Sequence, residues 1–144
     1  MNRSKANQKP NPGTSAAATI FIIDDEPMLL ELGVMLLAPA GYHLRIFRSA
    51  EDAFAAFLEG TTRPDLIITD YAMQEMTGMD LIKKCREIFP AQKVILVSGT
   101  VDERIYTHAA CKPDRFLAKP YTGRQLTRAV HEVLKSSPVR SPAV

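Results

Sequence analysis

With 144 residues and 46% hydrophobic side chains, the chain can form one domain with a substantial buried core, and a multi-domain architecture is not expected. The net charge of +2 is unevenly distributed: residues 19–136 carry 14 basic and 16 acidic side chains, and the excess positive charge lies near the two ends. A mildly acidic body lacks the concentrated basic stripe of a nucleic-acid-binding domain, so we expect no direct contact with nucleic acid.

Neither the cysteines nor the hydropathy points to export or to a membrane. Cys85 and Cys111 are too few for a disulfide framework and lack the spacing of a metal-binding motif, which favours reduced thiols in the cytoplasm. The first apolar run, residues 20–23, is too short for a signal peptide core, and no later run could span a bilayer. We therefore expect a cytoplasmic protein without a membrane segment.

The two ends of the chain differ in composition from its body. Residues 1–18 hold almost no large apolar side chain, and residues 137–144 are short and interrupted by proline. Such segments cannot offset the entropy of ordering, so both are predicted to be disordered arms. The folded domain is then predicted to cover residues 19–136.

The first predicted strand, residues 19–23, is an apolar run that ends at two acids, Asp24 and Asp25. Pro27 suits the first turn of a following helix, where an N–H has no intrahelical partner. Gly41 ends this segment. The apolar face of the helix is predicted from Leu29, Leu32, Leu36 and Leu37.

Residues 42–46 alternate apolar and polar side chains, which is typical of an exposed edge strand with Tyr42, Leu44 and Ile46 turned inward. Ser49 is predicted to cap the next helix, with Asp52 three residues on. The apolar face of that helix is predicted from Ala53, Phe54, Ala56, Phe57 and Leu58.

The third strand is predicted from the apolar run at residues 66–68, which needs no polar alternation if both its faces are buried. This strand ends at Asp70. A loop containing Gly78 and a third helix follow. The next buried strand, residues 94–97, ends at Ser98.

The last third of the chain begins with a weak predicted helix at residues 101–111, which are poor in apolar pairs and in good helix formers. Residues 116–118 predict a short strand that ends at Lys119, and Thr122 can cap a final helix. The apolar face of that helix is predicted from Leu126, Ala129, Val130, Val133 and Leu134.

Five strands that alternate with five helices predict an α/β fold with a parallel sheet and helices on both faces. Right-handed crossovers bring the carboxyl ends of all strands to one rim, where ligands bind in open α/β folds. Asp24, Asp25 and Asp70 would meet there with Ser98 and Lys119. Three close carboxylates either hold protons or share a hard cation, for which Mg²⁺ is the natural choice, and the lysine and hydroxyl complete a receptor for a phosphoryl group.

Four segments, IFIIDDEP, IITDYAMQEMTGMD, ILVSGT and RFLAKPY, occur in this order and resemble the motifs of response-regulator receiver domains of two-component signalling. The resemblance covers roughly residues 19–136. It implies a flavodoxin-like, doubly wound, five-stranded parallel sheet with five helices. Because only a short tail follows the last helix, we expect a stand-alone, single-domain receiver.

The resemblance also implies roles for individual residues. Asp70 would accept a phosphoryl group from the phosphohistidine of a histidine kinase or a histidine phosphotransfer protein. Asp25 would bind Mg²⁺ directly and Asp24 chiefly through water, with the backbone carbonyl of Ala72 as a further ligand. Ser98 and Lys119 would hold the phosphoryl oxygens, and Phe116 would be the switch aromatic that moves inward with Ser98.

Output in this family uses the fourth helix, fifth strand and fifth helix, so residues 101–131 are predicted to bind a downstream effector protein after phosphorylation. The chain would be a switch and not an enzyme that turns over substrate. Two alternatives remain: a receiver-fold adaptor that does not use phosphate, and a Mg²⁺-dependent phosphohydrolase of the haloacid dehalogenase type. The phosphohydrolase pattern requires an aspartate two residues after the nucleophile, where this chain has Ala72.

Overall fold

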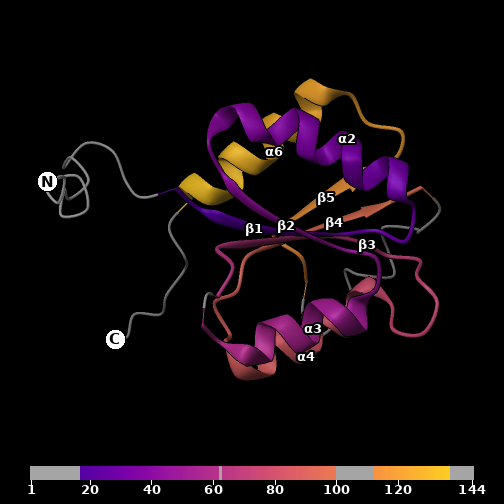
Figure 1. Ribbon diagram of the computed structural model, residues 1–144, viewed down its shortest axis with the longest axis vertical. Coiled ribbons are helices and arrows are strands. Elements are labelled where there is room, and N and C mark those ends of the chain that lie inside the picture. The colour runs from indigo at the N-terminus through magenta and orange to yellow at the C-terminus, as the bar shows by residue number, and fades with distance from the viewer. Residues whose placement is uncertain (1–16, 62, 100–111, 137–144) are drawn as a thin grey trace, which may run out of the picture.

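The computed structural model describes residues 17–61, 63–99 and 112–136 (Figure 1). Within these ranges five parallel strands form one sheet in the order β2-β1-β3-β4-β5. The strands are β1 (Thr19–Ile23), β2 (His43–Phe47), β3 (Leu66–Asp70), β4 (Val94–Ser98) and β5 (Arg115–Ala118). The helices are α2 (Pro27–Leu37), η1 (Ala38–Ala40), α3 (Ala50–Glu59), α4 (Gly78–Ile88) and α6 (Gly123–Lys135).

This architecture confirms the predicted α/β class and the five-stranded parallel sheet with helices on both faces. The helix predicted at residues 101–111 lies outside the described residues, and so do residues 1–16 and 137–144 of the two arms.

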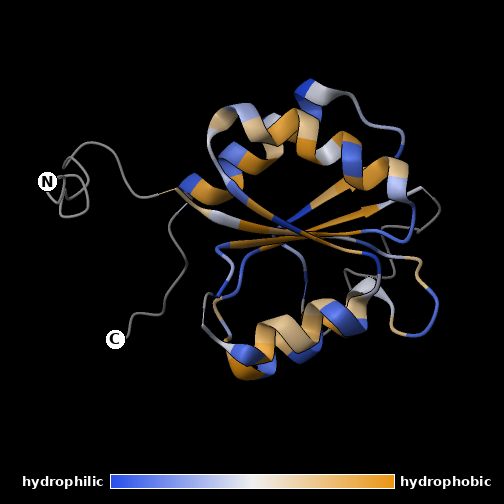
Figure 2. Ribbon diagram, in the orientation of Figure 1, coloured by the Kyte–Doolittle hydropathy of each residue, from blue (hydrophilic) through white to orange (hydrophobic). Residues whose placement is uncertain are grey.

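The sheet lies between two layers of helices, with α2 and α6 on one face and α3 and α4 on the other (Figure 1). Successive residues of a strand point to opposite faces. In β1, Ile20 and Ile22 therefore join the core under α2 and α6, and Phe21 and Ile23 join the core under α3 and α4. Both faces are covered, which is why the central strands are hydrophobic along their length (Figure 2).

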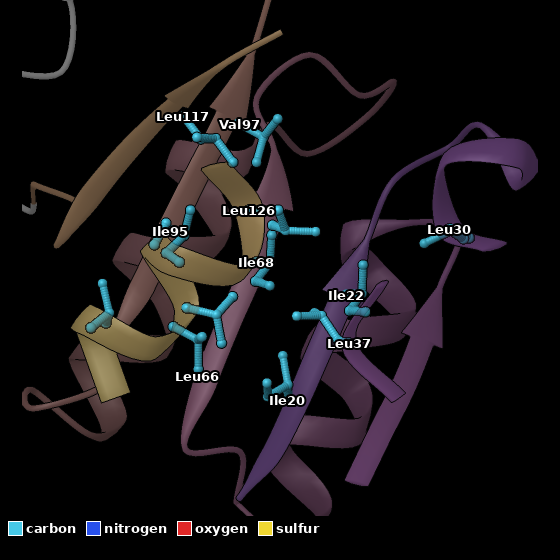
Figure 3. Packing of buried hydrophobic residues seen from close by; sticks show 13 residues of the cluster. Ile20, Ile22, Leu30, Leu37, Leu66, Ile68, Ile95, Val97, Leu117 and Leu126 are labelled. Carbon is cyan, nitrogen blue, oxygen red and sulfur yellow. The ribbon is translucent and has the colours of Figure 1, made fainter. Parts of the chain in front are cut away.

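The core under α2 and α6 contains side chains from four neighbouring strands and both helices (Figure 3). In α2 the buried stripe follows Leu30, Gly33 and Leu37. The predicted face of this helix was wrong at Leu32, which is 39% exposed. Apolar residues occur on most sides of this helix, so their spacing alone did not show which side faces the core.

Side-chain caps begin three of the helices. Ser49 Oγ accepts from Asp52 N at the start of α3, as predicted. Thr122 begins α6 with a capping box in which Gln125 is the partner, which confirms the predicted cap. Thr77 begins α4 with a second capping box, a cap that the sequence analysis missed, so that Gly78 is the first residue of the helix.

The edge strand β2 is less protected than the alternating pattern predicted. Ile46 was expected to face inward, but it is 47% exposed. Leu58 at the end of α3 was expected on an apolar face and is also exposed. Both lie at the margin of the sheet and helix layers, where none of the described elements covers them. No helix in the described ranges is long and apolar enough to cross a membrane.

Candidate functional site

Four strands deliver polar side chains to the same rim of the sheet. Asp24 follows β1, Asp70 is the last residue of β3, Ser98 is the last residue of β4, and Lys119 follows β5. Parallel pairing in register sets these ends side by side: Ile23 pairs with Thr69, Asp70 with Val97, and Ser98 with Ala118. The predicted convergence of these residues is therefore observed.

The centre of the site is an acidic cluster of Asp24, Asp25 and Asp70. One carboxylate oxygen from each lies within 4.8 Å of the others. Lys119 Nζ lies 3.3 Å from Asp24 Oδ2 and 3.2 Å from Asp70 Oδ1, so one ammonium bridges two of the three acids. Asp24 and Asp70 are buried, whereas Asp25 is exposed at the mouth of the cluster.

Backbone hydrogen bonds hold the strand ends that carry these side chains. Asp24 N donates to Phe47 O of β2 at 3.1 Å, and Asp24 Oδ1 accepts from Glu26 N at 2.9 Å. Lys119 N donates to Ser98 O at 3.0 Å. Because these hydrogen bonds restrain the backbone at the strand ends, the side chains of the cluster are held close to one another.

Gly78 presses the start of α4 against the backbone of Asp70. A Cβ atom at Gly78 would lie 2.4 Å from Asp70 O and 3.0 Å from Leu96 Cδ1. The loop after β3 turns back here, with Gly78 N donating to Tyr71 O at 3.0 Å. Only glycine permits this close approach. The sequence analysis interpreted Gly78 as a loop residue, but its role is to let the start of α4 contact the backbone of Asp70.

The charges of the cluster are coupled. Burial, and after it the Asp24 carboxylate, raises the pKa of Asp70, while Lys119 acts in the opposite direction. Burial lowers the pKa of Lys119, but the Asp24 and Asp70 carboxylates outweigh burial and raise it on balance. Lys119 therefore stays protonated at neutral pH and partly neutralises an acidic cluster that is costly to keep ionised.

The donor set of this site fits a hard divalent cation. Three carboxylates converge, two of them within a buried rim and one at an open mouth, and oxygen ligands of this kind suit Mg²⁺, which keeps several of its waters. Ala72, whose carbonyl was predicted as a further ligand, lies two residues after Asp70 in the loop, and its side chain is exposed. Its role as a ligand stays a prediction.

The two residues of the predicted switch occupy suitable elements. Ser98 is buried at the carboxyl end of β4. Phe116 in β5 is partly buried and packs against the core under α3 and α4. Their coupled movement stays a prediction.

Sequence reasoning overlooked Tyr121, which lines a small cavity behind the cluster together with Asp24 and Asp70. The sequence signal was its place two residues after Lys119, at the end of the segment RFLAKPY.

The comparisons with known proteins agree with this geometry. The family model described as "Response regulator receiver domain" matches residues 20–131. Sensor kinase CckA of Brucella abortus is 30% identical over 122 residues, 84% of this chain and 13% of that protein. Response regulator receiver protein CpdR of the same organism is 27% identical over 122 residues, 80% of this chain and 95% of that protein.

A crystal structure of a response regulator receiver domain protein from Clostridium thermocellum has a TM-score of 0.74 and 29% identity, with 81% of this chain and 94% of that chain covered. The chain spans about half or less of the length of several other curated relatives.

Receiver domains are signalling modules of two-component systems; they bind Mg²⁺ at an acidic pocket and interact with histidine kinases or phosphotransfer proteins. Four lines of observation agree for this chain: the ordered motifs, the parallel sheet of five strands, the acidic cluster bridged by lysine, and the family match over most of the fold. The chain therefore belongs to the response regulator receiver domain family.

Proposed function

We propose that the chain is a Mg²⁺-dependent phosphoacceptor switch in a phosphorelay, with Asp70 as the acceptor. The observation that carries this proposal is the convergence of Asp24, Asp25 and Asp70, with Lys119 Nζ 3.2 Å from Asp70 Oδ1. The donor would be the phosphohistidine of a histidine kinase or a histidine phosphotransfer protein, and the output would be contact with a downstream effector protein.

In the proposed reaction, an Asp70 carboxylate oxygen attacks phosphorus. A P–O bond forms as the P–N bond to the donor imidazole breaks; the other ring nitrogen of the donor is protonated, so neutral imidazole leaves with the bonding electron pair. The Lys119 ammonium holds Asp70 in its ionised form before the reaction and pairs with a phosphoryl oxygen afterwards. Ser98 donates a hydrogen bond to another phosphoryl oxygen.

The site residues would hold the metal as follows. Asp25, at the exposed mouth, binds Mg²⁺ directly; Asp24 acts chiefly through water; and Asp70 and the Ala72 carbonyl supply further oxygens. When bound, Mg²⁺ neutralises charge on the phosphoryl group during transfer. Phe116 would then follow Ser98 inward and carry the change to the output surface.

The proposal includes a cytoplasmic location and no direct contact with nucleic acid or membrane. The mildly acidic body and the sparse cysteines support these points. It also includes the absence of substrate turnover, which is supported by the receiver family and by Ala72 in the position where the haloacid dehalogenase pattern needs a second aspartate.

Acetyl phosphate tests the proposal without knowledge of the natural kinase. The wild-type chain, incubated with acetyl phosphate and Mg²⁺, is expected to gain one phosphoryl group by intact-protein mass spectrometry. Asp70→Asn is expected to gain none. Asp52→Asn, which changes an exposed acid in the first turn of α3, is the matched control and should be labelled like wild type.

The same assay separates the alternatives. An adaptor that does not use phosphate would take up no label, and its partner binding would survive Asp70→Asn. A phosphohydrolase would release phosphate continuously from p-nitrophenyl phosphate. Labelling of Asp70→Asn at the wild-type level would contradict the proposed acceptor.

A further inference from the structure

A small cavity lies directly behind the acidic cluster, on the side of the sheet that α2 and α6 cover. It leaves about 20 Å³ open to the centre of a water molecule, more than the roughly 10–15 Å³ that one water needs. Most of its wall is apolar, with Ile22, Leu37 and Leu126 among the residues that line it. Only three lining residues have polar side-chain atoms: Asp24, Asp70 and Tyr121.

Tyr121 connects this cavity to the core. Its ring is partly buried and packs against the core cluster under α2 and α6. Burial raises the pKa of its phenol; Lys119 acts in the opposite direction, and Asp24 and Asp70 add to the rise. The phenol therefore stays protonated at neutral pH and can act as a hydrogen-bond donor.

The Asp24 carboxylate has two partners among the described residues, and neither comes from the cavity. Oδ1 accepts from Glu26 N at 2.9 Å, and Oδ2 faces Lys119 Nζ at 3.3 Å. A carboxylate oxygen can accept more than one hydrogen bond, so a donor in the cavity has an acceptor available. Three polar side chains line the cavity, and about three hydrogen bonds are usual for a buried water.

We propose that Tyr121 is a positioning residue for the acidic cluster, whose hydroxyl donates to one water in this cavity that in turn donates to the carboxylates of Asp24 and Asp70. This water-mediated hydrogen bond, on the cavity side, would restrict the rotation of the Asp24 carboxylate. The carboxylate would then be held in the orientation that the Mg²⁺ site on its other side needs. This inference deepens the proposed function, since it rests on the same cluster as the Mg²⁺ site.

Isothermal titration of the metal-free chain with MgCl₂, without any phosphoryl donor, tests the inference. Tyr121→Phe removes only the hydroxyl and is expected to weaken Mg²⁺ binding about fivefold, the value of one ordinary hydrogen bond. Tyr42→Phe is the matched control, because Tyr42 is also partly buried and packs against the same core cluster. It precedes β2, at the opposite end of the sheet, and should bind Mg²⁺ like wild type.

A double-mutant cycle shows whether Tyr121 acts through Asp24. In an Asp24→Asn background, Tyr121→Phe is expected to cost clearly less than fivefold in Mg²⁺ affinity, because only the contact of the water with Asp70 remains to be lost. A fivefold loss that persists in that background would overturn the inference, and so would wild-type affinity in the single Tyr121→Phe variant. A crystal structure of the wild-type chain is expected to contain the water, and an empty cavity would also overturn the inference.

The outcome does not depend on phosphoryl transfer. If acetyl phosphate failed to label Asp70 while Tyr121→Phe still weakened Mg²⁺ binding, the proposed function would fail and the positioning role would stand. If labelling succeeded and Tyr121→Phe bound Mg²⁺ like wild type, the positioning role would fail alone.

Discussion

Replacing Gly78 with alanine is expected to disturb both the stability of the fold and the position of Asp70. The added Cβ would lie 2.4 Å from Asp70 O and 3.1 Å from Asp70 C, where ordinary contacts begin at 3.4 Å. The atoms it meets are backbone atoms at the end of a strand that is paired on both sides with β1 and β4. Either α4 or the end of β3 must therefore move by about 1 Å.

The size of the effect follows from two opposing terms. Overpacking of this kind costs about 1–3 kcal/mol. Alanine is favoured over glycine in a helix by about 0.5–1 kcal/mol, which offsets part of that cost. We expect a net loss of about 1–2 kcal/mol in the free energy of unfolding, which lowers the melting temperature by about 3–8 °C. Because misplacement of a reacting group by about 1 Å can cost 100-fold in rate, labelling of Asp70 should slow by at least tenfold.

Thermal unfolding followed by circular dichroism measures the first effect, and the initial rate of labelling by acetyl phosphate at saturating Mg²⁺ measures the second. Gly33→Ala is the matched control. Gly33 lies within α2, and the nearest atom to an added Cβ is Ile22 Cδ1 at 3.5 Å, an ordinary contact. This variant should be more stable than wild type by about 0.5–1 kcal/mol. A Gly78→Ala variant that melts at the wild-type temperature and is labelled at the wild-type rate would refute the reasoning.

Three further predictions concern pH, thiol reactivity and an ion-pair network. Burial, and after it the Asp24 carboxylate, raises the pKa of Asp70 above its ordinary value of 3.8. The folded chain therefore keeps this proton to higher pH than the unfolded chain does. As pH rises through the raised pKa, ionisation of Asp70 lowers the free energy of unfolding. Without Mg²⁺, Asp70→Asn should melt above wild type at neutral pH and converge with it near pH 3.8; a difference independent of pH would contradict this. Burial raises the pKa of Cys85 to about 12, so in a chain whose other cysteine is replaced by serine, this thiol should react with Ellman's reagent only after unfolding. Arg86 donates hydrogen bonds to three acceptors in the loops before β4 and β5: Gln92 O, Lys112 O and Asp114 Oδ2. Arg86→Ala should therefore lower the free energy of unfolding in urea by about 2 kcal/mol. Arg115→Ala, which removes the exposed ion pair with Glu132, should lower it much less, and equal losses would refute the comparison.

Local signals predicted the strands well because their burial on both faces leaves a continuous apolar run. β1 ends just before Asp24, as the apolar run predicted, and β3 and β4 end at Asp70 and Ser98. The caps at Ser49 and Thr122 were predictable for a similar reason, since a cap depends on residues within one helical turn.

Burial at the margins was harder to predict than burial at the centre. Ile46 and Leu32 are apolar and fit a periodic pattern, yet more than a third of the surface of each is exposed. Periodicity tells which residues share a face, but whether another element covers that face depends on segments distant in sequence. For Ile46, the edge position of β2 was predicted, but not that its inward face would stay half exposed.

The sequence by itself determined the class of fold, the residues that end the strands, and the chemical character of the rim, because hydrophobic runs and charged ends are local properties. Only the tertiary structure decided how those residues meet. Lys119 contacts Asp24 across 95 positions of chain, Gly78 touches the backbone of Asp70, and Tyr121 shares a cavity with both acids. These distances depend on strand order, register and the packing of α2, α4 and α6 against the sheet, and a pattern along one segment carries no information about them.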